Sequence, residues 1–550
     1  MRKPDFLWRE MDGAVIEGFG VSDHAQINDR SRAHVKTTLR RRRFSAPVEV
    51  NVLPAVADRA EFRKSAMLVD EKIVMSGASG WRALNAYRWE NEAEDFDPEE
   101  KLQAFLLACQ KKNKGSQLPV EQIFLENDLD FAVECRNTFN FYHFMVESLT
   151  QLTVLDEVGF QGRITFHYPN SEDKRRDFTS AFVEALFPEF AGRVFFERAP
   201  QDYGMVMTAF DLTVALAQAP QADVADLSKL MPKDAGDDLD LSTTAGRHLF
   251  NSNVVSSSLL ALRARALKAI EGHDFSYLPK RFYVGRDMRN SRARPVDGEA
   301  QLVEHLARFD FEQVAFEHFT PLEQIALMAQ AEVMISCHGA GFTNMLFANK
   351  DALVIELGTL QTAQERWSDF WPLANAAGCR YISFFADYNA EDPLIEPRFN
   401  VDGILPVRLS SKGTAQVVSF IVSALGHAPN MPNPASLAQL VRRLLRARLA
   451  QQAMTLMEAH QPMVRGSIDL MLLLADCHKD MGETQSELVV LEQACNLDPS
   501  RWQTLIRLFW CANSCDRPEV IRWALSVLER DFPKRYEAFV TNHEWVRFVA

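Results

Sequence analysis

Between residues 281 and 357 the sequence alternates short apolar runs with longer amphipathic segments, and this pattern limits the possible folds more than any other feature. Short apolar runs are typical of buried strands, whereas the longer segments have the spacing of helices. The alternation predicts a parallel sheet of Rossmann type with helices on its faces. We expect strands over 281–286, 312–317, 333–336 and 352–357, and helices over 298–309 and 320–331.

A second alternating block precedes the first one. A strand runs into a helix near residue 140, residues 163–169 form another apolar run, and the alternation continues to about residue 215. We therefore predict an α/β fold with two Rossmann-like domains, over residues 46–255 and 256–428. Residues 1–45 are polar and predict an irregular extension. Residues 218–248 are poor in large apolar side chains and predict a long surface insertion or interdomain segment.

The pattern changes to helices alone after a proline-rich linker at 426–436. Two blocks, 466–499 and 500–533, align at a period of 34 residues. Paired helices at this period resemble tetratricopeptide repeats, so residues 432–550 predict an all-α repeat domain. The alternative is an ordinary helical hairpin.

Composition limits the classes of function. The formal net charge is −14, so the chain has no whole-molecule field that would attract nucleic acid. The basic run LRRRRF at 39–44 predicts a solvated loop. The eight cysteines lack zinc-site spacing and predict reduced thiols. No secretory leader or transmembrane segment is predicted, which favours a cytoplasmic protein or one attached peripherally at the inner face of the membrane.

The sequence ISCHGAGFTN at 335–344 places glycines between a predicted strand and a predicted helix. Such a turn offers unpaired backbone N–H groups and the positive end of a helix dipole, which suit a phosphate or another anion. Its alternative role is packing alone. The candidate donor-binding residues here are His338, Gly339, Ala340, Gly341, Phe342, Thr343 and Asn344.

Arg286 ends the predicted strand 281–286, and Arg289, Arg292 and Arg294 follow it in the next loop. Because parallel strands end at one edge of a sheet, this loop and the glycine turn are expected to meet there. Arginine forks beside a helix N-terminus form a suitable clamp for a diphosphate. The alternative is that these arginines only solvate a loop.

The segment NFYHFMVESL at 140–149 carries the second candidate site. His143 and Glu147 are four residues apart and share one helix face, with Asn140 about one turn earlier. A half-buried carboxylate beside an imidazole can act as a general base. The alternative is a solvated surface pair, but the apolar neighbours of this pair favour a cleft.

These segments together resemble glycosyltransferase family 61. The resemblance is carried by NFYHFMVESLTQL, by YVGRDMRNSR and by residues 311–357 with their HGAG-Thr-Asn turn, and it spans about residues 45–425. It implies a GT-B fold, in which two Rossmann-like domains face a cleft, and an inverting transfer from a nucleotide-activated sugar. It also implies a link with bacterial capsule or lipopolysaccharide synthesis. The family often has Asn-Glu after the arginine loop, and VDGE stands here instead, which leaves Asp297 and Glu299 as open equivalents.

The residues and the resemblance predict one mechanism. The donor diphosphate binds the HGAGFTN turn, Arg286 and Arg292 neutralise the leaving group, and Glu356 accepts hydrogen bonds from the ribose. Glu147 or His143, with Asn140 nearby, deprotonates the acceptor hydroxyl of a glycan or lipid-linked saccharide. We expect a UDP-sugar donor, no required metal, and no nucleic-acid partner; the repeats are expected to bind a protein partner or a second copy.

Two rival functions remain open from the sequence. A hydrolase would use CHGAG as an oxyanion loop, but it needs a GxSxG nucleophile turn, and GASGW at 77–81 does not complete one. A catalytically inactive, transferase-like scaffold could act through the helical repeats. The donor sugar, its nucleotide, the acceptor, the linkage and the oligomeric state depend on pocket shape and surfaces that motifs do not specify.

Overall fold

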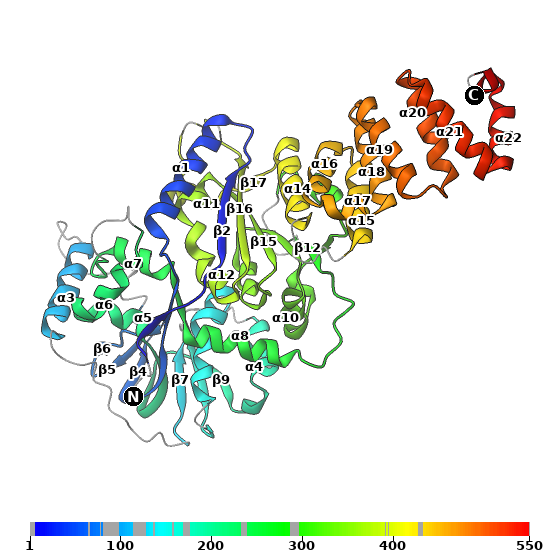
Figure 1. Ribbon diagram of the computed structural model, residues 1–550. Helices are drawn as coiled ribbons and strands as arrows, with labels where there is room; N and C mark the ends of the chain where they lie inside the picture. Colours follow the sequence, from blue (N-terminus) through cyan, green and yellow to red (C-terminus); the bar gives the residue numbers. More distant parts are fainter. Residues whose placement is uncertain are drawn as a thin grey trace. The chain divides into compact units, whose positions relative to one another are not determined.

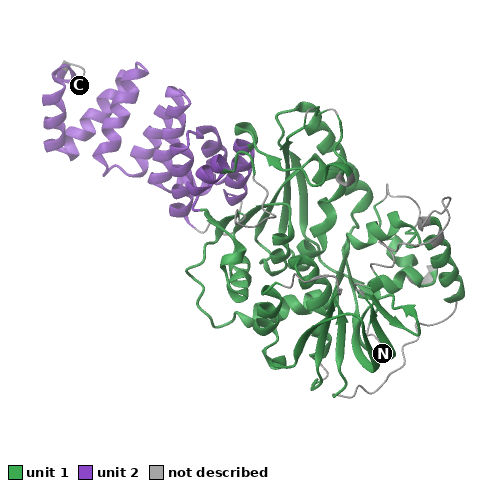
Figure 2. Cartoon of the chain, turned by 180° about the vertical axis from the view of Figure 1, so that it is seen from behind, with its two compact units in different colours: residues 1–299, 311–413 green, residues 300–310, 414–550 purple. Residues whose placement is uncertain are grey.

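A computed structural model describes residues 6–63, 66–77, 79–80, 98–113, 128–135, 138–156, 159–168, 176–232, 239–285, 296–390, 392–393, 395–426 and 433–548. By its internal contacts the chain divides into two compact units (Figure 2). The first contains residues 1–299 and 311–413, and the second contains residues 300–310 and 414–550. Every strand of the described residues belongs to the first unit, whereas the second is helical.

The parallel sheet predicted from residues 281–357 is confirmed (Figure 1). Its order is β13-β12-β14-β15-β16, all parallel, and β16 also pairs with β2 in parallel and with the short β17 in antiparallel. The strands are β2 (Val15–Gly20), β12 (Arg281–Val284), β13 (Glu312–Val314), β14 (Val333–Cys337), β15 (Leu353–Thr359), β16 (Arg380–Tyr388) and β17 (Val407–Arg408).

Helices connect these strands as the alternation predicts. The predicted start of the helix at 320–331 is confirmed in detail: the Thr320 hydroxyl and the Glu323 carboxylate form a capping box, with Pro321 in the first turn. The connecting elements are α9 (Glu299–Ala307), η5 (Phe316–His318), α10 (Pro321–Ala329), η6 (Ala340–Phe347), α11 (Leu360–Glu365), η7 (Trp367–Phe370), α12 (Trp371–Ala377), α13 (Phe399–Asp402) and α14 (Ser411–Gly426).

The strand order decides where this sheet can hold a ligand. Among strands β12 to β16, β12 comes first along the chain, and its two neighbours are the second strand, β13, and the third, β14. The chain therefore changes direction between β12 and β14, and a doubly wound sheet has its ligand crevice at the carboxyl ends of two such strands. The ends are in register, with Val284 beside Ser336.

The N-terminal sheet is mixed. Its order is β6-β5-β4-β10-β7-β8-β9, parallel from β10 to β9 and antiparallel from β10 to β6. In chain order β7 is the first parallel strand and lies between the second, β8, and the fourth, β10, so the change of direction falls between β7 and β10. The strands are β4 (Val52–Arg63), β5 (Ala66–Val69), β6 (Lys72–Ile73), β7 (Phe131–Glu134), β8 (Ile164–Tyr168), β9 (Val194–Arg198) and β10 (Gln201–Asp211).

Several helices accompany the N-terminal sheet. The π-helix η1 and the 3-10 helix η2 follow β7 directly, and α4 follows β8. The elements are α3 (Pro98–Asn113), η1 (His143–Ser148), η2 (Leu149–Leu155), α4 (Phe178–Leu186), η3 (Pro188–Phe190), α5 (Leu212–Ala215) and η4 (Leu216–Gln218).

The prediction of an irregular segment over residues 1–45 is wrong for residues 8–42. Strand β2 belongs to the C-terminal sheet, and the helix α1 (Ala25–Arg42) follows it. A Cβ at Gly18 would lie 3.0 Å from side-chain atoms of Phe385, Trp367 and Val35, so this strand packs closely against its neighbours. The basic run at 39–44 is likewise the last turn of α1 and its continuation, not a solvated loop. A third small sheet joins β1 (Trp8–Glu10), β3 (Val48–Val50) and β11 (Val254–Ser256).

The prediction of a surface insertion over residues 218–248 is also wrong in its described part. Helices α6 (Gln221–Ser228) and α7 (Thr244–Asn251) form there. Of the large apolar residues of this segment, Val224, Leu227, Leu230, Leu239 and Leu241 are buried in one cluster with parts of α3 and β3, and Met231 packs against that cluster partly buried. The segment is thus short of apolar residues but uses those it has as core.

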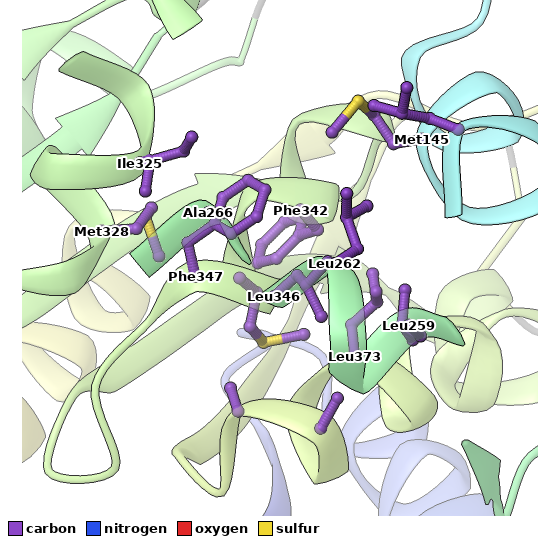
Figure 3. Close-up of a cluster of buried hydrophobic side chains, with 14 of the residues drawn as sticks. Met145, Leu259, Leu262, Ala266, Ile325, Met328, Phe342, Leu346, Phe347 and Leu373 are labelled. Atoms are coloured by element: carbon purple, nitrogen blue, oxygen red, sulfur yellow. The ribbon is translucent and has the colours of Figure 1, made fainter. Parts of the chain in front are cut away.

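One apolar core joins the two larger sheets inside the first unit. It contains Phe131 and Phe166 from the N-terminal sheet and Val354 and Tyr381 from the C-terminal sheet. Helix α8 (Ser257–Ala269) packs against η2 and α4 and also against η6, α10 and α12. Figure 3 shows its side chains between those of Met145 and Phe347. The predicted boundary at 255/256 therefore falls at the start of a helix shared by both sheets, and it stays a prediction.

The predicted change to helices alone and the 34-residue period are confirmed. Helix α18 begins at Ile468 and α20 begins at Trp502, and each is followed by a second helix that packs against it. The tetratricopeptide identity stays a prediction. The helices are α15 (Pro434–Arg446), α16 (Ala450–Ala459), α17 (Gln461–Arg465), α18 (Ile468–Asp480), α19 (Thr484–Leu497), α20 (Trp502–Ser514), α21 (Pro518–Asp531), α22 (Pro533–Asn542) and η8 (Glu544–Phe548). Among the described residues no helix combines the length and apolarity that a membrane crossing needs.

Candidate functional site

The first half of the site follows strand β7 at the change of direction in the N-terminal sheet. The π-helix η1 begins at His143, and π-helical turns often occur at functional sites. His143 Nδ1 lies 2.7 Å from Glu147 Oε1, so the contact predicted from the four-residue spacing is present. Their side chains are 21% and 16% exposed, which makes the pair neither core nor open surface. Asn140 Oδ1 accepts the backbone N–H of His143 at 3.3 Å, so Asn140 fixes the start of this turn.

A buried carboxylate that the sequence analysis missed lies beneath this pair. Glu134 ends β7, is 4% exposed, and its Oε1 accepts the Ser79 N–H at 3.0 Å. Burial raises the pKa of Glu134, and the charge of Glu147 acts in the same direction. Gly77 has φ +51°, and a Cβ there would lie 3.2 Å from Glu134 Oε1, so this turn passes close to the carboxylate. A glutamate at the end of an apolar strand was the available sequence signal.

The second half of the site lies at the carboxyl end of β14. His338 Nδ1 is 2.5 Å from Glu356 Oε1 on the neighbouring strand β15. The other oxygen, Oε2, accepts from Tyr381 Oη at 2.6 Å and from Ser383 Oγ at 2.8 Å. Burial and the Glu356 charge both raise the pKa of Tyr381, so its hydroxyl stays a donor. With hydroxyl donors on one oxygen, the carboxylate is the acceptor for His338 Nδ1–H, which fixes the imidazole.

This arrangement corrects the role expected for Glu356. Its side chain has no exposed surface, and protein donors occupy both oxygens. It therefore cannot accept a ribose hydroxyl in this conformation. Its role is to orient His338, whose side chain is 11% exposed.

The glycine turn is only partly accessible. His338, Gly339, Ala340 and Gly341 are partly exposed, and the helix that follows is the 3-10 helix η6, which begins at Ala340 and not at the threonine. The first N–H groups of a helix have no partner within it, so these residues offer backbone donors. The φ of Gly339 is 164°, which is extended backbone.

The next three candidates, Phe342, Thr343 and Asn344, are corrected because their side chains are buried. Phe342 packs with Leu262 and Leu346 in the shared core (Figure 3). The Thr343 hydroxyl donates to Ala340 O at 2.7 Å, and Asn344 Nδ2 donates to Gln324 Oε1 at 3.2 Å. These side chains hold the turn and do not line a donor site.

In the sequence the arginine loop follows β12 directly, and Arg286, Arg289, Arg292 and Arg294 lie outside the described residues. The ends of β12 and β14 are joined by Ser336 Oγ, which donates to Val284 O at 3.1 Å. The two strands that precede the loop and the glycine turn are therefore neighbours, and the meeting of the loop with the turn stays a prediction.

Aromatic contacts bring the two halves of the site together. The ring of Phe370, which ends η7, lies 5.1 Å from the His338 ring and 6.0 Å from the Tyr142 ring. Tyr142 in turn lies 5.6 Å from the ring of His143. The sequence analysis missed Tyr142 and Phe370, because contacts across two sheets leave no local signal. The two His–Glu pairs therefore belong to one region of the first unit.

A comparison with protein families bears on the functions left open. Residues 141–355 match the family model Glycosyltransferase 61. The matched segment begins at Phe141, just before the His143–Glu147 pair, and ends at Ile355 within β15. It contains that pair and the glycine turn with His338, but not Glu134, Glu356 or Phe370. The match supports glycosyltransferase family 61 and a glycosyltransferase activity in general, and hence a sugar donor and an acceptor. It gives no support to the hydrolase alternative. No curated protein matches the chain.

Among the described residues no three His, Cys, Asp or Glu side chains gather in a way that could hold a metal ion. None of the eight cysteines, which all lie in the described part of the chain, forms a disulfide. Burial raises the pKa of Cys379, Cys477, Cys495 and Cys511 to about 12, so these thiols stay protonated.

Proposed function

We propose that this chain is an inverting glycosyltransferase of GT-B type that moves a sugar from a nucleotide-activated donor to a saccharide acceptor. The observation that carries the proposal is the aromatic link from His143 through Tyr142 and Phe370 to His338. It joins two His–Glu pairs, each of which follows the carboxyl end of a parallel strand in a different sheet. A transfer reaction needs its donor and its acceptor held close together. Two strand edges that are joined in this way can each hold one of them.

The C-terminal sheet suits the donor. The crevice between β12 and β14 offers backbone N–H groups of residues 339–341, the oriented His338 imidazole and the start of the arginine loop. Backbone donors and cations at a strand–helix turn favour a diphosphate. We expect Arg286 and Arg292 to neutralise the departing nucleoside diphosphate, and a UDP-sugar is the expected donor.

The N-terminal pair suits the acceptor. In an inverting transfer the acceptor oxygen forms a bond to the anomeric carbon while the bond from that carbon to the diphosphate oxygen breaks. The acceptor proton must go to a base in the same step. Glu147 is partly exposed and held by His143, so it can reach a bound hydroxyl and accept that proton.

We further propose a saccharide or lipid-linked saccharide as acceptor, within bacterial capsule or lipopolysaccharide synthesis, and a protein partner or a second copy on the helical repeats. A cytoplasmic enzyme, or one attached peripherally at the inner face of the membrane, fits this role. No required metal or other cofactor is expected. These points rest on the family resemblance and on the separate helical unit.

The test is a thermal-shift screen of the full chain with UDP-, GDP-, CMP- and TDP-sugars, followed by product analysis with the donor that binds. The expected result is stabilisation by one class of nucleotide sugar, reduced in a His338→Ala variant, and transfer with inversion at the anomeric carbon. Binding without hydrolysis or transfer to any acceptor would favour the inactive scaffold. Absence of binding by all four classes would refute the proposal.

A further inference from the structure

A pocket of about 230 Å³ lies in the first unit, away from the site described above. It is bounded by residues 11–16 before and at the start of β2, by residues 43–47 after α1, and by Asn253, Trp371 and Asn375. None of the predicted catalytic or donor-binding residues lines it. A water molecule occupies about 30 Å³ in the liquid, so the pocket has room for a small organic molecule or ion but not for a nucleotide sugar.

The main charged group of the pocket wall is the Arg43 guanidinium. Its Nη2 donates to Ala14 O at 2.6 Å and its Nη1 donates to Ile16 O at 3.3 Å. Among the described residues no carboxylate forms an ion pair with it, although the charge of Glu17 acts on it at longer range. Burial lowers the pKa of Arg43, which is the mark of a cation held away from water. A guanidinium has five N–H donors, so most of them remain for a ligand.

Of the basic run that the proposed transferase function does not use, Arg43 lines the pocket. Arg40, Arg41 and Arg42 form the last turn of α1, and Arg43 follows directly. Asp12 is the acidic residue of the pocket lining, and its side chain is exposed. Water screens an exposed carboxylate far more than a half-buried guanidinium. The balance inside the pocket is therefore positive.

Polar groups of the opposite wall are fixed by the fold. Asn375 Oδ1 accepts the Ala14 N–H at 3.0 Å, and Asn253 Oδ1 accepts the Phe44 N–H at 2.9 Å. The two asparagine side chains are therefore the polar part of this wall, and Trp371 has no exposed surface that could bond a ligand.

We propose that this pocket is a binding site for a small anion that carries a carboxylate or phosphate group. The ligand oxygens accept hydrogen bonds from the Arg43 guanidinium, and the remaining polar wall orients the ligand. The site is separate from the donor turn, but the two are linked along the chain: Trp371 of the pocket wall, at the start of α12, directly follows Phe370, which ends η7 and contacts His338. Occupancy of the pocket stabilises this start of α12. The proposal does not depend on the transferase function.

The test uses the full chain, isothermal titration calorimetry, and inorganic phosphate and malonate as probes at constant ionic strength. Ser45 lines the pocket with an exposed side chain, and its backbone N–H bond to Leu230 O does not involve that side chain. Ser45→Glu and Ser45→Gln give side chains of equal size that differ only in charge. Binding to the donor turn is the same in both variants, so a difference between them isolates the pocket.

We expect at least one probe to bind the wild-type chain and Ser45→Gln within about twofold of each other, and Ser45→Glu about tenfold or more weakly. Arg43→Gln should lose this binding to a similar degree, provided that its circular dichroism is unchanged. The probe that binds distinguishes a phosphate site from a carboxylate site. Equal affinities of Ser45→Glu and Ser45→Gln, or no binding of either probe to the wild-type chain, would overturn the proposal.

Discussion

Glu356→Gln separates the orientation of His338 from the folding of the site. The carboxylate of Glu356 accepts from His338 Nδ1, Tyr381 Oη and Ser383 Oγ. The amide has the same shape but only one acceptor oxygen. If that oxygen keeps the two hydroxyl donors, the amide NH₂ group faces His338 Nδ1, which must then become an acceptor. The imidazole loses its Nδ1 proton and its charged partner, and the other nitrogen, Nε2, carries the proton.

The size of the effect follows from the bonds that change. A hydrogen bond to a charged group contributes about 1.5–3 kcal/mol, whereas a neutral one contributes about 1 kcal/mol. Replacing a charged contact at His338 by a neutral one should therefore weaken binding of a nucleoside diphosphate about tenfold, because the imidazole is held less firmly in the orientation that faces the donor. The free energy of unfolding should fall by only about 1–3 kcal/mol, since volume is kept and each hydroxyl still has an acceptor. Glu356→Ala would leave three buried donors unpaired and is a poor test.

The assay is calorimetric titration with UDP alongside urea unfolding of the same protein. Ser383→Ala is the matched control: it removes a donor from the same carboxylate but leaves the contact with His338. We expect the control to lose stability and keep its affinity for UDP. Should Glu356→Gln unfold cooperatively near the wild-type denaturant concentration and still bind UDP with wild-type affinity, Glu356 does not prepare His338 for the donor.

The remaining predictions concern the base, the clamp, a buried histidine and the repeats. Glu147→Gln should slow single-turnover transfer about 10²- to 10⁴-fold with donor binding kept, and His143→Ala should slow it less; the opposite order would exchange their roles. Calorimetry of Arg286→Ala should show nucleoside diphosphate binding weakened by about 2–5 kcal/mol, and unchanged affinity would exclude the clamp. Burial lowers the pKa of His167 from its usual 6.5 to about 4. The unfolded chain therefore binds a proton that the folded chain does not, so urea titrations should show stability lost by up to about 3 kcal/mol as pH falls from 6.5 to 4, a slope that His167→Gln removes. Deleting residues 432–550 should keep donor binding, and a soluble truncated chain that cannot bind donor would show that the repeats complete the site.

Local sequence was sufficient where neighbouring residues decide the structure. The strand and helix alternation over 281–357, the capping box at Thr320 and the contact of His143 with Glu147 all depend on residues a few positions apart. The order of two parallel strands, and the sheet edge at which both end, could also be predicted from the sequence, because connections of this kind obey strong rules of handedness and adjacency. This is why the arginine loop and the glycine turn were placed on one edge.

Contacts between distant segments could not be predicted in this way. Strand β2 pairs with β16, which lies more than 360 positions later in the chain. The six residues of β2 do not indicate which strand it pairs with. Strand β15 is buried along its whole length, so alternation could not tell whether Glu356 faced a ligand or the protein. Phe342 was assigned to the donor turn because it stands within the motif, but its apolar side chain is buried in the core.

The two His–Glu pairs differ in burial, and this difference supports the separate roles that we propose for them in donor binding and in proton transfer. Both pairs have an imidazole nitrogen in contact with a carboxylate, and by residue type alone either carboxylate could be the base. A base must reach the acceptor hydroxyl and then carry its proton. Glu356 has no exposed surface and holds two hydroxyl donors, so a substrate cannot approach it, whereas Glu147 is 16% exposed and its contact is with His143. The buried pair is therefore suited to fixing an imidazole against the donor. The partly exposed pair is suited to proton transfer. This division agrees with the proposal that the C-terminal sheet holds the donor and the N-terminal sheet holds the acceptor.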